Sequence, residues 1–237
     1  MARRNFKPGA LTAPLPPVMV SVGDMENSNI ITIGWTGILS TIPPRTYISV
    51  RPQRHSYSII KDKKEFVINL TTAKQARVVD YAGIYTGAKV DKFKECGLTK
   101  VKSKEVSAPT IAECPVSLEC RVIEVIPMGT HDVFIADIVS VSCDDSILDE
   151  NGKIRFDRAD LLAYAHGEYF ALGEKLGSFG FSTKKQAIKV AEKSANVRAS
   201  QNNNREDEVK QTVKRPFYLD APRGRGKTKS KGKGKKR

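Results

Sequence analysis

The sequence is short of long apolar runs and of paired cysteines, and both absences exclude whole classes of protein. None of its 237 residues lies in an apolar run near the roughly 18–20 residues that a membrane-spanning helix needs. Its four cysteines form no Cys-x-x-Cys pair, which argues against a disulfide scaffold and a zinc knuckle. Two arginines near the N-terminus are followed by no apolar segment, so we expect no secretory signal. We therefore expect a cytoplasmic protein without a membrane partner.

Histidine is scarce, and the common catalytic motifs are missing. The chain has three histidines, His55, His131 and His166. It contains no Gly-x-Ser-x-Gly, His-Glu-x-x-His, P-loop or Gly-x-Gly-x-x-Gly sequence. The sequence therefore contains no motif that indicates a hydrolase, and we expect no metal site.

Positive charge is concentrated at the C-terminal end. Residues 182–237 hold 18 Lys and Arg against 5 Asp and Glu, whereas residues 1–181 carry a net charge of only +1. The last 15 residues include nine basic ones and no large apolar one, so they cannot bury enough surface to offset their ordering entropy. We divide the chain into a folded domain (1–181), a C-terminal helix (182–200) and a disordered basic tail (201–237). The tail either binds nucleic acid or another polyanion, or is simply solvated.

Short segments rich in β-branched and aromatic residues, bounded by turn residues, dominate the folded domain. They predict strands over 18–22, 30–35, 46–50, 66–71, 116–126 and 133–141. Residues 56–64 and 72–84 instead have the apolar spacing of helices. The pattern predicts a mainly β fold, a barrel with helical decorations.

The segment from residue 29 to residue 57 has the most unusual composition. It joins a strand, a Gly-Trp-Thr-Gly stretch, a Pro-Pro turn, a second strand and a loop of Arg and Ser. Small residues let a planar ligand approach backbone amides, and hydroxyl and guanidinium groups suit a phosphate. The segment therefore indicates a site for a planar, phosphorylated cofactor. The alternative is a hairpin with a solvated loop.

A series of short motifs runs through about residues 12–181: Asn29-Ile-Ile-Thr32, Trp35-Thr-Gly37, Pro43-Pro44, Ser49-Val-Arg-Pro52 with Arg54 and Ser56, Phe66-Val-Ile-Asn69, Asp80-Tyr-Ala-Gly83, Gly87 with Asp91-Lys-Phe93, Gly97-Leu-Thr99, Ala108-Pro-Thr-Ile111, Glu113-Cys-Pro-Val116, Leu118-Glu-Cys120 and Gly129-Thr-His-Asp-Val-Phe134. In their order and spacing these motifs resemble the flavin reductase-like, FMN-binding split-barrel family, and within it the flavoredoxin branch. One position departs from the family pattern, because Ala136-Asp137 stand where the family usually has Gly-Glu.

The resemblance implies a six-stranded, Greek-key split barrel that binds FMN without a covalent bond and forms a homodimer. It implies an oxidoreductase in which electrons pass from NADH, NADPH or a redox protein through FMN to an acceptor. The cofactor-binding residues that it implies are Asn29, Thr32, Ile33, Gly34, Trp35, Thr36, Ser40, Ser49, Val50, Arg51, Arg54, Ser56, Asn69 and Lys92. Within this set Thr32 to Thr36 would lie along the flavin ring, Ser40, Ser49 and Asn69 would serve the ribityl chain or the ring edge, and the arginines, Ser56 and Lys92 would hold the phosphate. His131 would face the flavin and the nicotinamide as the catalytic residue.

Each of these assignments has a plainer alternative. Trp35 could instead be a core or interface residue, and Lys92 could be a surface lysine. His131 could be a turn residue at the start of a strand. For the whole protein, the alternative function is a binding module with a flavin-type fold, whose basic tail engages nucleic acid or an acidic partner without turnover. Storage of FMN without turnover is a third interpretation.

Overall fold

The structure, a computed structural model, describes residues 3–183. The chain divides into two units, residues 1–175 and 176–237. The first unit contains all the strands discussed below, and the described part of the second ends in a short 3-10 helix, Phe181–Thr183. The predicted helix (182–200) and basic tail (201–237) lie outside the described residues, apart from residues 182 and 183. Within residues 3–183, no helix is both long enough and apolar enough to cross a membrane.

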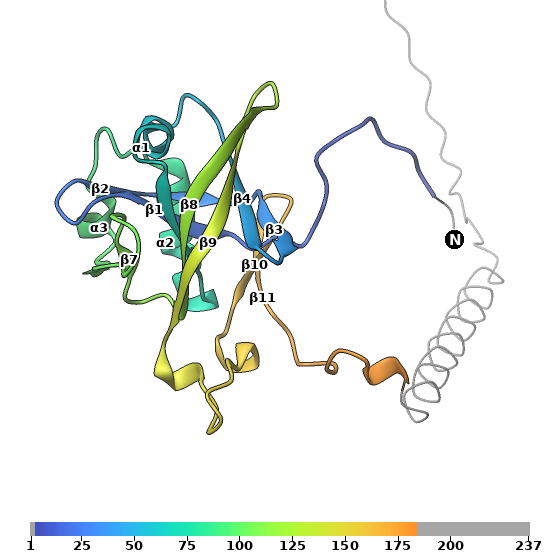
Figure 1. Cartoon of the computed structure of the whole chain (residues 1–237). Coiled ribbons are helices and arrows are strands. Elements are labelled where there is room, and N and C mark those ends of the chain that lie inside the picture. Colours follow the sequence, from blue (N-terminus) through green and yellow to red (C-terminus); the bar gives the residue numbers. More distant parts are fainter. Residues whose placement is uncertain (1–2, 184–237) are drawn as a thin grey trace, which may run out of the picture. The chain divides into compact units, whose positions relative to one another are not determined.

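Seven strands form one antiparallel sheet in the order β2-β1-β5-β8-β9-β4-β3 (Figure 1). These strands are β1 (Val18–Gly23), β2 (Ser28–Ile33), β3 (Thr36–Thr41), β4 (Pro44–Val50), β5 (Glu65–Leu70), β8 (Val116–Pro127) and β9 (Asp132–Cys143). Two small two-stranded sheets pair β6 (Lys100–Val101) with β7 (Thr110–Ile111) and β10 (Leu162–Ala165) with β11 (Glu168–Ala171). The mainly β prediction is confirmed.

The two outermost strands of the sheet are neighbours in the sequence. β2 lies at one edge and β3 at the other, yet only Gly34 and Trp35 separate them along the chain. A flat sheet cannot satisfy both conditions, so the sheet curls until its edges meet. The Ser49 N–H donates a hydrogen bond to the Trp35 carbonyl (3.0 Å), which ties this link to β4. The result is a barrel that is split between its edge strands.

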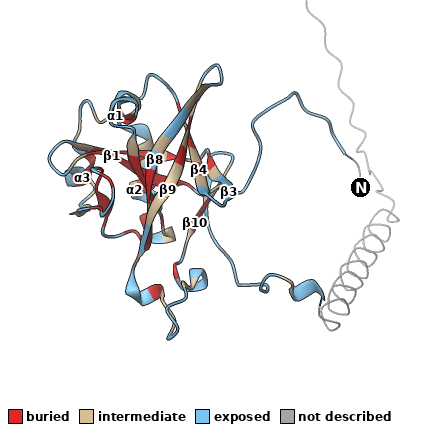
Figure 2. Ribbon diagram, in the orientation of Figure 1, coloured by how far each residue is buried: buried red, intermediate tan, exposed pale blue. Residues whose placement is uncertain are grey.

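Helices cover the barrel where its residues are apolar on the outside. Within the barrel, Val20, Ile48, Phe66 and Phe134 form the main core, and Ile60 of α1 (His55–Lys63) packs into it. A second apolar cluster lies on the other side of β1, where α2 (Ala76–Ile84) and α3 (Lys92–Glu95) pack. β1 is therefore buried on both faces, as the red colour of its ribbon in Figure 2 shows. Short 3-10 helices complete the fold at Ala73–Gln75, Asp145–Ile147 and Phe156–Arg158.

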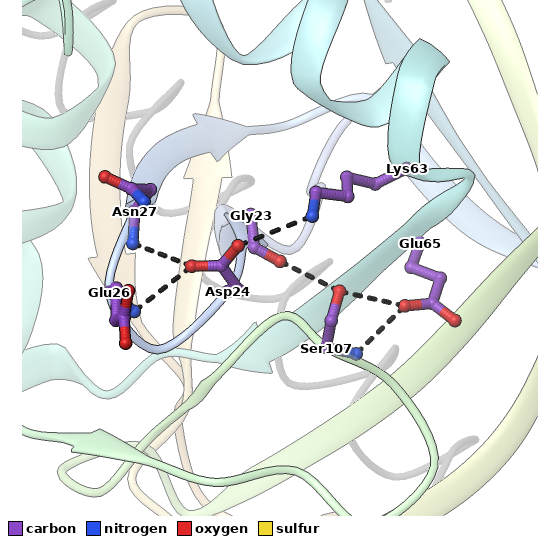
Figure 3. A network of polar contacts seen from close by, with 7 residues as sticks. All are labelled: Gly23, Asp24, Glu26, Asn27, Lys63, Glu65 and Ser107. Atoms are coloured by element: carbon purple, nitrogen blue, oxygen red, sulfur yellow. Dashed lines mark hydrogen bonds and ion pairs between the residues drawn. The ribbon is translucent and has the colours of Figure 1, made fainter.

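Two buried or half-buried carboxylates fasten the loop of residues 103–108 to the barrel. Glu119 of β8 accepts hydrogen bonds from the N–H groups of Lys104, Glu105 and Val106. Glu65 of β5 accepts from the N–H and hydroxyl of Ser107, and that hydroxyl also contacts the Gly23 carbonyl (Figure 3). The loop is thereby held at the end of β1.

The differences from the predicted elements have local causes. The strand predicted over 30–35 ends at Ile33, because Gly34 and Trp35 form the link between the edge strands. β3 follows this link as a seventh strand of the main sheet, where six strands were expected. The helix predicted over 72–84 begins as a 3-10 turn whose Thr72 and Gln75 form a capping box, and only Ala76–Ile84 is α-helical.

Candidate functional site

A cavity of about 400 Å³ lies where the edges of the barrel meet. Residues of β2, of the two-residue link, of β4 and of the hairpin β8–β9 line it, together with tyrosines of β10 and β11. The lining residues are Pro17, Ile31, Thr32, Ile33, Gly34, Trp35, Ser49, Val50, Arg51, Arg54, Gly83, His131, Tyr164 and Tyr169. Eight of the residues predicted from the sequence to bind a cofactor are in this set: Thr32, Ile33, Gly34, Trp35, Ser49, Val50, Arg51 and Arg54.

The free edge of β2 presents backbone groups to this cavity. β2 pairs with β1 on one side only, and the hairpin between them closes with a hydrogen bond from the Asp24 N–H to the Asn27 carbonyl. Counting the antiparallel alternation from that bond leaves the N–H and C=O of Ile30 and Thr32 pointing away from β1. Ile30 uses its carbonyl to accept from Lys92. Thr32 therefore offers a donor and an acceptor at the edge of the cavity, as a planar heterocycle requires.

A second, smaller cavity of about 80 Å³ adjoins the first, and the two share Ile31 and Arg54. Its lining is polar and includes Asn29, Gln53, His55, Ser56, Thr86, Gly87 and Lys92, with Tyr85 beside them. Helix α1 begins at this cavity, and no side chain caps its first turn. Its first amides and the positive end of its dipole therefore favour an anion.

Lys92 is the most unusual group of the smaller cavity. Only 3% of its surface is exposed, and its Nζ donates to the carbonyls of Ile30 (2.8 Å) and Ala82 (2.7 Å). No carboxylate of the described residues forms an ion pair with it. Burial, and secondarily the charge of Arg54, lower the pKa of Lys92 to about 8. The interpretation of Lys92 as a surface lysine is therefore wrong. A buried cation without an acidic partner makes this cavity electrostatically favourable for an anion.

Two arginines line the larger cavity, and one of them, Arg54, also lines the smaller one. Arg54 donates from Nη1 to the Gly83 carbonyl (3.1 Å), which joins the start of α1 to the end of α2. Arg51 donates from Nε to Nε2 of His131 (3.3 Å). Both arginine side chains are exposed and keep further N–H groups for a ligand. They add positive charge on the side of the larger cavity.

His131 lies beside Trp35 at the mouth of the larger cavity. Their ring centroids are 4.5 Å apart with a tilt of 49°, and the Thr130 hydroxyl lies 2.9 Å from His131 Nδ1. Burial, followed by the charges of Arg51 and Arg54, lowers the pKa of His131 below its ordinary value. The lowered pKa favours the neutral ring, which is the form that accepts the hydrogen bond of Arg51 at Nε2. Trp35 itself is well exposed, so it is not a core residue.

Three residues predicted to contact the cofactor do not line either cavity. Asn69 is fully buried, where its amide donates to the Met19 carbonyl and to Ser21 Oγ and accepts from the Ile111 N–H and Ser117 Oγ. Its hydrogen-bonding capacity is used inside the protein, which corrects its assignment to the ribityl chain or ring edge. The Thr36 hydroxyl donates to the Tyr47 carbonyl (2.6 Å), and the Ser40 hydroxyl donates to the Pro43 carbonyl on the edge strand. Both of these side chains serve the β3–β4 hairpin.

Two tyrosines that were not predicted from the sequence line the larger cavity. Tyr164 and Tyr169 come from the hairpin of β10 and β11, and their rings are 5.3 Å apart. Tyr169 donates to Asp80 Oδ1 (3.2 Å), and burial, followed by the charge of Asp80, raises the pKa of Tyr169 to about 12. The available signal for this hairpin was the pair of short segments Leu-Ala-Tyr-Ala and Glu-Tyr-Phe-Ala on either side of the turn dipeptide His166-Gly167.

A barrel with an aromatic-walled cavity next to a small cationic pocket is a geometry that suits a planar ligand with an anionic group. The comparison with known families agrees with this description. The profile of the flavin reductase like domain matches residues 11–173. The chain therefore belongs to the flavin reductase-like family. Membership in this family supports a redox function with a bound flavin.

Individual relatives place the chain within the family. The solved structure of flavoredoxin from Desulfovibrio vulgaris (Miyazaki F) is 32% identical and superposes with a TM-score of 0.72, covering 77% of this chain and all of that one. An uncharacterized protein of Archaeoglobus fulgidus is 34% identical over 135 residues, which are 57% of this chain and 76% of that protein. The FMN-binding protein of Thermus thermophilus shares the fold at 23% identity, with a TM-score of 0.63 over 75% of this chain and 98% of that one. The resemblance to the flavoredoxin branch is confirmed.

Proposed function

We propose that this protein binds FMN without a covalent bond and is an oxidoreductase that passes electrons from NADH, NADPH or a redox protein to an acceptor. The flavin ring would occupy the larger cavity and the phosphate the smaller one. The observation that carries the proposal is the buried ammonium of Lys92, which has no acidic partner in the described structure and lines the smaller cavity. The names of relatives support it, because they include flavoredoxin, an FMN-binding protein and a monooxygenase reductase component.

The residues of the smaller cavity fit a phosphate monoester. Lys92, Arg54, the Ser56 hydroxyl and the first amides of α1 all donate hydrogen bonds, and three phosphate oxygens need such donors. Lys92 uses two of its three N–H groups on carbonyls, so one is left for the ligand. The site thus favours FMN over riboflavin, which lacks the phosphate.

The residues of the larger cavity fit a flat ring. Gly34 and Gly83 line it without side chains, so a ring can approach their backbone, and Tyr164 and Trp35 provide aromatic faces. Thr32 would bond the polar edge of the ring with its free backbone groups. When bound, FMN supplies the hydride and electron transfer, and the protein supplies orientation and shielding from water.

Anaerobic titration of the purified protein tests the proposal. We expect a yellow protein with a flavin absorbance band that NADH, NADPH or a reduced redox protein bleaches. A colourless protein that binds no added FMN would overturn the proposal. Colour that no donor bleaches would instead support FMN storage without turnover.

His131 should affect reduction by a nicotinamide and leave FMN occupancy nearly unchanged. The neutral ring lies beside Trp35 and holds Arg51, so its loss would misplace the incoming nicotinamide and slow flavin reduction by about 10- to 100-fold in His131→Ala. Stopped-flow absorbance with NADH and NADPH measures the rate, and reduction by dithionite is the control. The wild-type rate should also change as pH falls through the lowered pKa of His131, where a second cation forms beside Arg51. If mutant and wild-type traces coincide, the donor is better sought among redox proteins.

The assembly and the compartment also belong to the proposal. We propose a homodimer, supported by the exposed Ile38 and Ile42 on and after edge strand β3, close in sequence to the cavity residue Trp35. Light scattering on the holoprotein measures its mass in solution. A cytoplasmic location is consistent with the four cysteines, all of which are free.

The C-terminal extension supports a second candidate function, the binding of nucleic acid. The family match ends at residue 173, and residues 182–237 carry a net charge of +13. We expect the full chain to bind an oligonucleotide at low salt, with an affinity that falls steeply as salt rises. A chain truncated after residue 200 should lose most of this binding and keep its flavin. Equal oligonucleotide binding by both chains, measured by fluorescence anisotropy, would contradict a role of the tail.

A further inference from the structure

A buried hydrogen bond joins β2 to α1 at the wall of the smaller cavity. Asn29, the second residue of β2, donates from Nδ2 to Oγ of Ser56 over 2.8 Å. The two side chains are 5% and 1% exposed, and both line this cavity. Ser56 is the second residue of α1, so its hydroxyl lies among the free amides of the helix start.

The direction of this hydrogen bond decides what Ser56 can offer to a ligand. A serine hydroxyl has one proton and can accept on its lone pairs. Because Asn29 donates to the oxygen, the proton of Ser56 is free to point elsewhere. No carbonyl or carboxylate of residues 3–183 accepts it. The remaining direction is toward the cavity.

Gly87 fixes the amide of Asn29 from the other side. A Cβ atom at position 87 would lie 2.2 Å from Asn29 Oδ1 and 2.4 Å from its Cγ, so the backbone of Gly87 packs directly against the amide. The backbone of Gly87 is not in the left-handed region, so glycine is needed here for space rather than for conformation. Gly87 also lines the smaller cavity.

We infer that Asn29 is a positioning residue that makes Ser56 a hydrogen-bond donor to the FMN phosphate, and that Gly87 holds Asn29 in place. The inference rests on the proposed function and adds a role that acts through Ser56 rather than by contact with the ligand. It predicts selectivity for the phosphate: affinity for FMN depends on Asn29, and affinity for riboflavin does not.

A double-mutant cycle on the apoprotein tests this coupling by fluorescence titration with FMN and with riboflavin. We expect Asn29→Ala and Ser56→Ala each to weaken FMN binding by about 10-fold and to leave riboflavin binding within about 2-fold. The double variant should bind FMN no more weakly than Ser56→Ala alone, because Asn29 acts through that hydroxyl. Gly87→Ala should reproduce the loss of Asn29→Ala. Gly173→Ala is its matched control, since a Cβ there meets nothing within 4 Å.

The outcomes separate this inference from the proposed function. If wild-type protein binds FMN and riboflavin equally, the phosphate site itself is misplaced and both proposals fail. If it prefers FMN but the two substitutions add in the double variant, or weaken both ligands equally, only the positioning role is overturned. Asn29→Asp keeps the shape of the side chain if Asn29→Ala does not fold. Its carboxylate accepts the proton of Ser56, so FMN binding should fall further while riboflavin binding is retained.

Discussion

Replacing Lys92 by methionine should lower the affinity for FMN roughly 30- to 5,000-fold and leave the affinity for riboflavin nearly unchanged. The range corresponds to the about 2–5 kcal/mol that is lost when one partner of a buried, hydrogen-bonded charge pair is removed. We expect the loss to lie toward the upper end of this range, because Lys92 is 3% exposed and has no carboxylate partner in the described structure. Fluorescence titration of the apoprotein with both ligands measures the two affinities.

Lys94→Met is the matched control for this substitution. Lys94 belongs to the same short helix, α3, but its side chain is exposed and lines neither cavity. The Lys94→Met protein should bind FMN and riboflavin with the affinities of the wild type. A Lys92→Met protein that still prefers FMN strongly would show that the phosphate lies elsewhere.

The lowered pKa of Lys92 makes both the affinity for FMN and the free energy of unfolding depend on pH. In the free protein the pKa is about 8, because burial and then Arg54 disfavour the charged form. A bound phosphate favours the charged form and raises that pKa, so FMN affinity should fall as pH rises above about 8 while riboflavin affinity does not. Without ligand, the unfolded chain holds this proton up to its higher ordinary pKa. This group therefore makes the free energy of unfolding rise with pH above about 8.

Replacing Glu119 by alanine should lower the free energy of unfolding by about 3–5 kcal/mol. Its carboxylate is 2% exposed and accepts from the N–H groups of Lys104 (3.0 Å), Glu105 (2.6 Å) and Val106 (3.2 Å). Alanine leaves these three donors without their acceptor, and the loop of residues 103–108 loses its main attachment. Urea denaturation followed by far-UV circular dichroism measures the change.

Glu124→Ala provides the control on the same strand. Glu124 is exposed on β8, so its loss should change the free energy of unfolding by less than about 0.5 kcal/mol. Glu119 lines neither cavity, so the folded Glu119→Ala protein should still bind FMN normally. If its stability equals that of the wild type, the loop does not depend on these hydrogen bonds.

The sequence predicted the strands whose side chains are apolar on at least one face, and it did less well where polarity hides a strand. β1, β4, β5, β8 and β9 were all expected, because their β-branched residues alternate or run together. β3 was not predicted, because Gly37, Ser40 and Thr41 are typical of a loop. Its Ile38 and Leu39 are exposed, so they do not form the apolar face that marks a buried strand. An edge strand is defined by its pairing partner, here β4, and not by its own composition.

For the site, the resemblance supplied the right segments, but the face of a strand decided individual residues. Phe66 and Ile68 of β5 point into the barrel core, so Asn69 falls on the opposite face and is used inside the protein. Lys92 could not be resolved from the sequence, because its burial depends on carbonyls of Ile30 and Ala82, the first of which is 62 residues away. Tyr164 and Tyr169 were missed for the same reason, since a distant hairpin brings them to the cavity.

The two-residue link between β2 and β3 connects the order of folding to the binding of the ligand. The hairpins β1–β2 and β3–β4 can form from local sequence, but the edges meet only after β5, β8 and β9 have paired between them. The larger cavity is built from both edges and from that link, so it exists only once the last of these pairings is complete. A ligand of this cavity therefore binds the native state alone and shifts the folding equilibrium by mass action, by about 2.7 kcal/mol at a hundredfold excess over Kd. Thermal stability should track flavin supply, which makes the apoprotein the form most exposed to proteolysis when flavin is scarce.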